Sequence, residues 1–495
     1  MQKNLKKLLS VLVIVGLLFS CVSCSSPPDE GADEGEVEVM ETEVLVVGSG
    51  LAGLSAAVKA AEEGAEVIVL EKMSAIGGNS ALSGAGIGAP ASAVQKEHGI
   101  VDCPEDYVEL WMEYNKDGRP ENPAPVYERC LFIAERGAEI IDWLISLGYE
   151  FDRPTDFDLI EGVDRFHYPS NYRGGAGQVQ RMAEVAEEKG VEILLETRAT
   201  ELITDDSGAV VGVKAKQNGE TKEFRAKAVV LATGGFAQSP ELVERFCPEH
   251  KDVISVASVS NTGDGILMAE EIGAALFEYP WLMGMSYRAT ADPQSSLNML
   301  GGPWEQSPLV DRTGARFINE YCHPLTYSTM IIRDAGPYYC IYGSDDEETV
   351  AILEENLDSG LVFKGETLEE LAKVCGFDTE TFVTTIERYC EGKRKGKDED
   401  FDARVDFMVA PETGPYYAVQ MTPTNMGSIG GIKTNTNAEV LRTDGSVIKG
   451  LYAAGEVANG DLYDIAYMSG TSVLNCYVMG RIAGENAARL AAGAN

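Results

Sequence analysis

Residues 43–71 read EVLVVGSGLAGLSAAVKAAEEGAEVIVLE, and this stretch decides the fold. A β-branched strand sequence runs into the glycine loop at 48–53 (GSGLAG), and an alanine-rich helix and a second strand follow it. In such a unit the first glycine permits a tight turn, the second admits a pyrophosphate to the backbone, and the third lets helix and strand pack closely. Glu71 ends the second strand, where a carboxylate can accept hydrogen bonds from a ribose. The pattern predicts an α/β, Rossmann-like domain that binds a dinucleotide at the helix N-terminus.

Further glycine-rich segments lie downstream at 77–80 (GGNS), 83–86 (SGAG), 231–236 (LATGGF), 261–265 (NTGDG) and 451–457 (LYAAGEV). In each segment small residues clear space for a large ligand, and a polar residue can bind it. A domain that binds NAD does not need the loop at 77–80. The set therefore indicates a different dinucleotide.

The order and the residues of these motifs resemble those of the FAD-binding family of fumarate reductase and succinate dehydrogenase flavoproteins. That family also contains urocanate reductases and 3-ketosteroid dehydrogenases. The resemblance covers residues 42–490 and implies a Rossmann-like FAD-binding domain with an inserted α+β capping domain. It implies an FAD-dependent oxidoreductase that acts on CH–CH groups. Members with covalent flavin carry a histidine near residues 79–82, which read NSAL here, so noncovalent FAD is expected.

The same resemblance implies a set of cofactor-binding residues. Glu71 and Lys72 would hold the adenosine end, and Asp264 and Glu456 would bind ribitol hydroxyls. The full set is Gly48, Gly50, Ala52, Gly53, Glu71, Lys72, Gly78, Asn79, Ser80, Gly84, Ala199, Thr233, Gly234, Asp264, Gly431, Glu456, Ser472 and Val473. Beyond Cys21 and Cys24 no C-x-x-C pair occurs, and no metal site is expected.

The N-terminus is typical of an export signal. Basic residues precede an apolar run at 8–19, which is too short to span a membrane. Cys21 follows small residues as in the lipobox of bacterial lipoproteins; Cys24 is the alternative, and an ordinary cleaved signal is also possible. Residues 25–41 contain seven acids and no bases, which favours an extended tether. We expect a lipid anchor on the outer face of the bacterial cytoplasmic membrane.

These patterns divide the chain into five parts. They are a signal peptide (1–20), a lipidated acidic tether (21–41), a first FAD-binding part (42–276), a capping domain (277–411) and a second FAD-binding part (412–495). Within the capping domain, amphipathic patterns predict helices at 366–375 and 379–391, and a charged run predicts a turn at 393–400.

Fumarate reductases bind and protonate their dianionic substrate with arginines and histidines at defined motif positions. Here residues 321–325 (YCHPL), which follow the F-x-N-E motif, contain no arginine, and the H-P-T position reads Tyr279-Pro280-Trp281. Residues 426–431 lack the histidine before M-G-G, and residues 467–471 lack the arginine of R-L-G-G-N. A buried dianion without a cation would cost several kcal/mol, so fumarate is not the expected substrate.

Tyr467, Ser469 and Gly470 resemble the flavin-proximal motif of the ketosteroid Δ4-dehydrogenase branch. There a tyrosine hydroxyl polarises an enone carbonyl. A phenol has a pKa near 10, so it stays protonated at neutral pH and can donate to an enolate. Further candidates from the other wall of the cleft are Tyr321, His323 and Tyr327, although packing alone would also explain an aromatic residue there. The expected substrate is a neutral or singly charged, largely apolar small-molecule carbonyl compound.

The main hypothesis is therefore an exported FAD-dependent reductase of an activated C=C bond in an α,β-unsaturated carbonyl compound. A flavin-dependent dehydrogenase of a saturated ketone, such as a 3-ketosteroid, is the alternative, and a non-catalytic surface electron-transfer flavoprotein is a third possibility. The sequence has no C-x-x-C-H haem motif and no length for an FMN domain. We expect a separate membrane-associated electron donor: a flavin or haem protein, or a quinol-linked one.

Charge argues against one class of partner. The chain of 495 residues has 79 acidic and 40 basic side chains, a formal net charge of −39. No basic stripe is available to displace the counterions of phosphates, so nucleic acid is not an expected partner.

Overall fold

The computed structural model describes residues 38–156, 162–300, 307–320, 323–334 and 336–493. The predicted signal peptide, Cys21 and Cys24 lie outside the described residues, as does Tyr321. No helix of the described ranges has the length and apolar character needed to cross a membrane.

A mixed sheet with a parallel centre forms the first part of the fold, with the strand order β15-β16-β8-β1-β2-β5. Strands β1, β2, β5, β8 and β16 run parallel, and β7 joins β6 to the edge of β8 in antiparallel fashion. The strands are β1 (Glu38–Val47), β2 (Val67–Leu70), β5 (Glu192–Leu194), β6 (Thr197–Thr204), β7 (Val210–Gln217), β8 (Glu220–Leu231), β15 (Glu439–Leu441) and β16 (Val447–Ala453). This topology confirms the predicted α/β, Rossmann-like fold.

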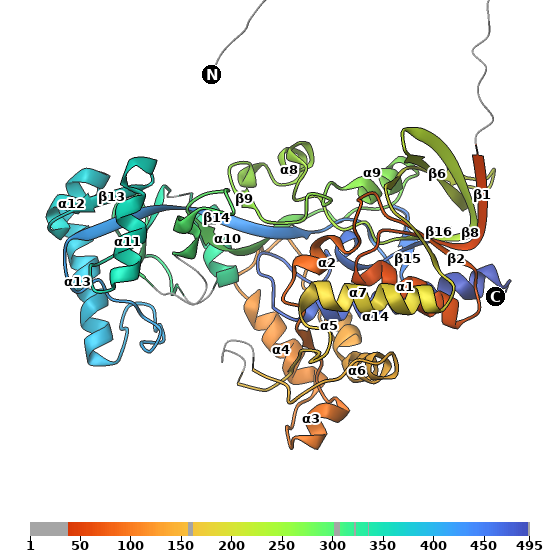
Figure 1. The fold of residues 1–495 in the computed structure, drawn as a ribbon, viewed down its shortest axis with the longest axis horizontal. Coiled ribbons are helices and arrows are strands. Elements are labelled where there is room, and N and C mark those ends of the chain that lie inside the picture. The colour runs from red at the N-terminus through yellow and green to blue at the C-terminus, as the bar shows by residue number, and fades with distance from the viewer. Residues whose placement is uncertain (1–37, 157–161, 301–306, 321–322, 335, 494–495) are drawn as a thin grey trace, which may run out of the picture. The chain divides into compact units, whose positions relative to one another are not determined.

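Both faces of this sheet are covered, as its continuous apolar strands require. Val44 and Val46 of β1 pack into one cluster, and Leu45 and Val47 pack into another on the opposite face. Helices α1 (Leu51–Glu62), α7 (Gly174–Glu188) and α14 (Thr471–Ala491) lie together and supply the first cluster (Figure 1).

Strand β1 begins earlier than the sequence predicted. Glu38 to Glu41 were assigned to the extended tether, but they pair with β8, where Glu38 lies opposite Lys222. The Lys222 ammonium lies 2.9 Å from the Glu38 carboxylate. The prediction was wrong for these residues because it could not foresee the long partner strand that binds their backbone.

A second sheet carries the remaining long strands, in the order β10-β14-β12-β11, and β9 and β13 also pair with β14. Its strands are β9 (Ile254–Ser255), β10 (Trp281–Arg288), β11 (Leu309–Val310), β12 (Tyr338–Tyr342), β13 (Val362–Gly365) and β14 (Tyr416–Ile429). The long strand β14, blue in Figure 1, starts after residue 411, so this sheet extends beyond the predicted capping boundary.

Helices α10 (His323–Arg333), α11 (Glu347–Glu355), α12 (Leu368–Cys375) and α13 (Thr379–Lys395) accompany the second sheet. The last two confirm the helices predicted from amphipathic patterns. Helix α13 is longer than predicted, because basic residues in its last turn suit the negative end of the helix dipole and Gly396 ends it at positive φ. The predicted turn at 393–400 therefore starts after Lys395.

The other elements of the described chain are short. They are α2 (Gly78–Leu82), β3 (Ile87–Gly88), α3 (Ala93–Glu97), α4 (Pro104–Tyr114), α5 (Tyr127–Ala134), α6 (Gly137–Ser146), β4 (Phe166–His167), α8 (Pro240–Phe246), η1 (Pro248–His250), α9 (Asp264–Glu271), η2 (Ser296–Met299), η3 (Leu357–Ser359) and η4 (Gly455–Val457).

Helices α1 and α14 are in unusually close contact. A Cβ atom added to Gly484 would lie 2.1 Å from the carbonyl oxygen of Ala56, and one added to Gly480 would lie 2.3 Å from that of Ala52. The two glycines therefore let α14 pack directly on the backbone of the helix that follows the phosphate-binding loop.

Replacing Gly484 with alanine tests this contact. Helix propensity alone predicts that Gly484→Ala raises the free energy of unfolding by about 0.5–1 kcal/mol. We expect a fall of about 1–3 kcal/mol instead, because the new methyl group meets rigid backbone. Urea unfolding followed by circular dichroism measures the difference.

The matched control is Arg489→Ala on the exposed side of the same helix, where the side chain is 58% exposed. Its unfolding free energy should change by no more than about 0.5 kcal/mol. A stabilised Gly484→Ala protein would contradict the close packing.

Candidate flavin site and catalytic end

A cavity of about 620 Å³ opens at the carboxyl ends of the central parallel strands. Val47 of β1 and Leu70 of β2 line it, and Ala232 lines it directly after β8. In open α/β sheets, ligands bind in the crevice at this edge. The cavity is therefore the natural place for the predicted cofactor.

Most of the predicted cofactor-binding residues meet on the wall of this cavity. They are Gly48, Gly50, Ala52, Glu71, Lys72, Gly78, Asn79, Ser80, Gly84, Ala199, Thr233, Gly234, Asp264, Glu456, Ser472 and Val473. The described cavity wall does not include Gly53 or Gly431. At Gly53 an added Cβ atom would lie 1.9 Å from the carbonyl oxygen of Gly48, which confirms its predicted part in helix–strand packing. Gly431 lies at a φ of +80°, and an added Cβ atom there would meet Val457.

The cavity has the unmet polar groups expected of a ligand site. Thr233 Oγ1 and Asn475 Oδ1 are buried and line the cavity, yet neither has a hydrogen-bond partner within the described chain. Buried polar atoms are rarely left without a partner, so a polar ligand is needed to complete these two. Both atoms, together with the glycine loop at the N-terminus of α1, fit a dinucleotide.

Two carboxylates, Glu71 and Asp264, line the part of the cavity where the adenosine of FAD is expected. Glu71 accepts hydrogen bonds from the Ser49 amide (3.1 Å) and from the Met73 amide (2.9 Å). Asp264 lies 3.0 Å from the Lys72 ammonium and 3.0 Å from the Arg198 guanidinium. Burial acts to raise the pKa of Asp264, but the Arg198 and Lys72 contacts outweigh burial and hold this pKa below its ordinary value.

Glu456 joins three segments of the cavity wall. Its carboxylate accepts hydrogen bonds from Asn79 Nδ2 (2.8 Å), Asn261 Nδ2 (3.0 Å) and the Ser428 amide (2.8 Å). Burial raises the pKa of Glu456 above its ordinary value in spite of these donors. The carboxylate is thus largely occupied within the protein, and it lines the cavity where a ribitol contact was predicted.

Tyr467 and Ser469 both line the same cavity. The Tyr467 ring contacts that of Tyr463 at 5.6 Å between centroids, and Tyr463 in turn stacks on Trp111 at 5.6 Å. Burial raises the pKa of Tyr467 well above its ordinary value near 10, although contacts with Gly470 and Ser472 act in the opposite direction. A phenol in this setting stays protonated and can serve as a donor.

The structure does not place the remaining catalytic candidates, Tyr321, His323 and Tyr327, on the described cavity wall. Tyr321 lies outside the described residues, and although His323 begins helix α10, its side chain is not described. Tyr327 was predicted on the cleft wall, but it is fully buried and is absent from the described cavity wall. Its hydroxyl lies 2.6 Å from His250 Nδ1. The ring occupies the space left open by Gly284, where an added Cβ atom would lie 2.4 Å from it.

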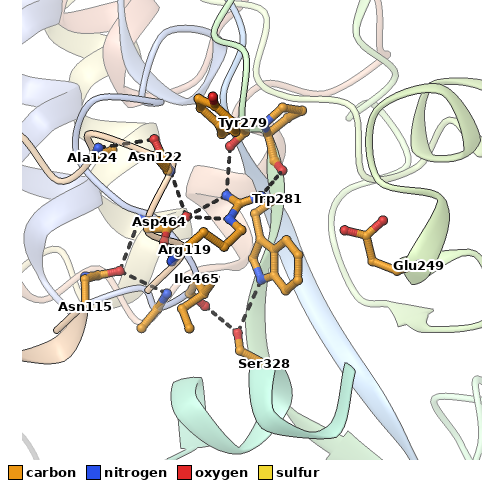
Figure 2. Close-up of polar contacts among 12 residues, drawn as sticks. Asn115, Arg119, Asn122, Ala124, Glu249, Tyr279, Trp281, Ser328, Asp464 and Ile465 are labelled. Carbon is orange, nitrogen blue, oxygen red and sulfur yellow. Dashed lines mark hydrogen bonds and ion pairs between the residues drawn. The ribbon is translucent and has the colours of Figure 1, made fainter. Parts of the chain in front are cut away.

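A polar network fixes the segment that precedes Tyr467. The Arg119 guanidinium bonds the Asp464 carboxylate at 2.7 Å and the carbonyl oxygen of Tyr279 at 2.9 Å, and it lies over the Trp281 ring (Figure 2). The Asn115 side chain accepts from the amides of Asp464 and Ala466, both at 3.1 Å. From the second sheet, Trp281 reaches the same segment through Ser328, which donates to the carbonyl of Ile465.

This placement differs from the fumarate reductase pattern, in which the H-P-T position, here Tyr279-Pro280-Trp281, contacts the substrate. Trp281 is buried below Arg119, and neither Tyr279 nor Trp281 belongs to the described wall of the cavity. They anchor the start of β10 to the Tyr467 segment instead.

Several residues on the cavity wall were missed by sequence reasoning. Phe166 of β4 and Tyr168 directly after it line the cavity, and Met283, Met285 and Arg288 of β10 line it as well. The motif comparison could not find them because none belongs to a glycine loop or to a fumarate-binding motif. The alternation of residues 166 and 168 in a short strand was the only available signal.

Comparison with known proteins identifies the family. Residues 43–473 match the family described as FAD binding domain. The chain is 34% identical over 467 residues to the urocanate reductase of Eggerthella lenta, which covers 91% of this chain and 75% of that protein. It is 33% identical over 461 residues to a fumarate reductase (cytochrome) of Shewanella frigidimarina, covering 90% of this chain and 77% of that protein.

A solved structure agrees with this relationship. The 3-ketosteroid-Δ4-(5α)-dehydrogenase from Rhodococcus jostii superposes with a TM-score of 0.72 at 27% identity, covering 92% of this chain and 99% of that one. The chain therefore belongs to the FAD-binding domain family and is an FAD-dependent oxidoreductase that acts on CH–CH groups. The predicted resemblance is confirmed.

The Arg119 network leads to a test of stability and turnover. Arg119→Lys keeps the charge but loses the planar fork that reaches both Asp464 and two carbonyl groups. We expect the free energy of unfolding to fall by about 2 kcal/mol, because hydrogen bonds to charged groups are each worth about 1.5–3 kcal/mol. Turnover should fall as well, since the Tyr467 segment loses an anchor.

Arg153→Lys is the matched control, because Arg153 is 56% exposed and pairs with Asp164 at the surface. It should change the unfolding free energy by less than about 0.5 kcal/mol. If the two substitutions change the free energy of unfolding equally, the Arg119 network does not stabilise the fold more than a surface ion pair does.

Proposed function

We propose that this chain is an exported reductase of an activated C=C bond in an α,β-unsaturated carbonyl compound, with FAD bound noncovalently. The observation that carries the proposal is that Tyr467 lines the flavin cavity together with Ser469 and Gly470 of the same motif. Relatives named as urocanate reductase and fumarate reductase support the direction of the reaction.

In this proposal the two hydrogens reach the double bond from different sources. FAD, when bound and reduced by the electron donor, would supply the hydride for one carbon of the polarised C=C bond. Tyr467 holds the proton for the neighbouring carbon on its hydroxyl oxygen, and Ser469, two residues further on, offers a hydroxyl that can return a proton to it. Phe166 and Met283 add apolar surface to the wall of the same cavity.

Tyr467→Phe tests the proposed acid. The substitution keeps the ring that packs on Tyr463 but removes the proton, so turnover should fall by about 10²- to 10⁴-fold. Reduced viologen as electron donor, with a panel of enones and enoates, measures it. The FAD content of each preparation is checked by absorbance.

Tyr149→Phe is the control, because Tyr149 is also buried but its hydroxyl donates to the carbonyl of Gln178, away from the described cavity wall. Its turnover should stay close to that of wild type, because Tyr149 does not belong to the described cavity wall. A Tyr467→Phe enzyme that loses less than tenfold would remove Tyr467 from the mechanism.

A second candidate function is the reverse reaction, a dehydrogenation of a saturated ketone. It is favoured by the structural similarity to the 3-ketosteroid-Δ4-(5α)-dehydrogenase and by the Tyr467-x-Ser469 motif. The test compares two rates: the reduction of an artificial acceptor with a saturated 3-ketosteroid as substrate, and the reduction of an enone with reduced viologen as electron donor. A faster first reaction would favour dehydrogenation.

We further propose that the electrons come from a separate flavin, haem or quinol-linked protein, and that a lipid on Cys21 or Cys24 keeps the enzyme at the membrane beside it. The basis is the lipobox-like sequence and the acidic segment after it. Replacing both cysteines with serine should release the protein from the membrane fraction during expression in a bacterial host. Membrane association that survives in the double variant would refute the anchor.

A further inference from the structure

Arg288 brings a positive charge to the cavity wall that no motif predicted. It is the last residue of β10, where it pairs across the second sheet with Thr422 of β14. Its side chain is partly buried and lines the cavity that also holds Tyr467. The conclusion from sequence that the substrate side lacks a cation is therefore incomplete.

Arg288 differs from the other charged residues of the cavity wall, because no side chain among the described residues pairs with its guanidinium. Glu71, Asp264 and Glu456 each accept hydrogen bonds from the protein, and Lys72 bonds Thr262 and Asp264. Within the described ranges, no hydrogen bond or ion pair involves the Arg288 guanidinium. A partly buried guanidinium is normally paired, because its planar donors match a carboxylate or phosphate in bidentate geometry. An oxyanion carried by a ligand would supply such a partner.

Other residues of the same cavity wall indicate what the rest of that ligand would be. Met283 and Met285 come from the same strand, and Met426 comes from the neighbouring strand β14. Thioether side chains adapt to irregular apolar shapes and make favourable contacts with aromatic rings. Phe166 and Tyr168 line the same cavity and add aromatic surface. The combination suits a largely apolar or aromatic body with a single anionic end.

We propose that Arg288 binds the carboxylate of the substrate, so that the enzyme selects singly charged, largely apolar unsaturated acids over their neutral counterparts. The inference rests on the proposed function, because it names the substrate class of that reaction. A single cation fits a monoanion, and this agrees with the loss of the residues that would hold a dianion.

The FAD phosphates are the other possible source of an oxyanion. Donors for them already exist at the glycine loop and the N-terminus of α1, which belong to the first sheet. Arg288 instead belongs to the second sheet, on the strand that carries Met283 and Met285. This placement favours the substrate carboxylate.

The test compares two probes with the same phenyl body, 3-phenylprop-2-enoate and the neutral 4-phenylbut-3-en-2-one. Binding to the oxidised holoenzyme is titrated through the flavin absorbance, and kcat/KM is measured with reduced viologen. Wild type should favour the enoate, and Arg288→Gln should weaken enoate binding about 10- to 100-fold while leaving the enone unchanged. Arg288→Lys should recover part of the loss, and Arg153→Gln at the surface should change neither constant.

Several results would overturn the assignment. They are a wild-type enzyme without preference for the enoate, an equal loss for both probes in Arg288→Gln, and weaker FAD binding in that variant with unchanged selectivity. The last result would assign Arg288 to the FAD phosphates. Arg288-dependent binding of the enoate without turnover of either probe would contradict the proposed reaction and support the assignment of Arg288.

Discussion

The carboxylate of Glu456 is the interaction on which the rest of the site depends. It binds Asn79 of the second glycine loop, Asn261 of the segment before α9, and Ser428 near the end of β14. These segments are far apart in the sequence, and a single buried acceptor holds them around one cavity. Because a buried acceptor that loses a donor is costly, each of these contacts constrains the others.

The catalytic end is held by a different arrangement. Asp464, Ile465 and Ala466 are bonded by Asn115 directly after α4, by Arg119 and by Ser328 of α10, so that Tyr467 follows a segment with little freedom. Preorganised donors are effective because they need not reorient during the reaction. The flavin loops and the Tyr467 segment are thus fixed by separate networks that face a common cavity.

The sequence predicted those features that local patterns encode. The unit at 43–71 was sufficient for the parallel sheet, and the glycine loops identified most of the residues that line the cavity. Tyr327 was placed wrongly because its position depends on space beside Gly284, on a strand distant in the sequence. Arg288 was missed because a single arginine at the end of a strand belongs to no motif. Only the structure shows that it lines the cavity and that no described side chain pairs with it.

The thioether wall of the cavity has a chemical consequence. Met283, Met285 and Met426 lie together on the surface that would contact the substrate. Oxidation of any of them to the sulfoxide would replace a flexible apolar group with a polar and chiral one. Exposure to peroxide should therefore change the chemical character of this part of the cavity wall.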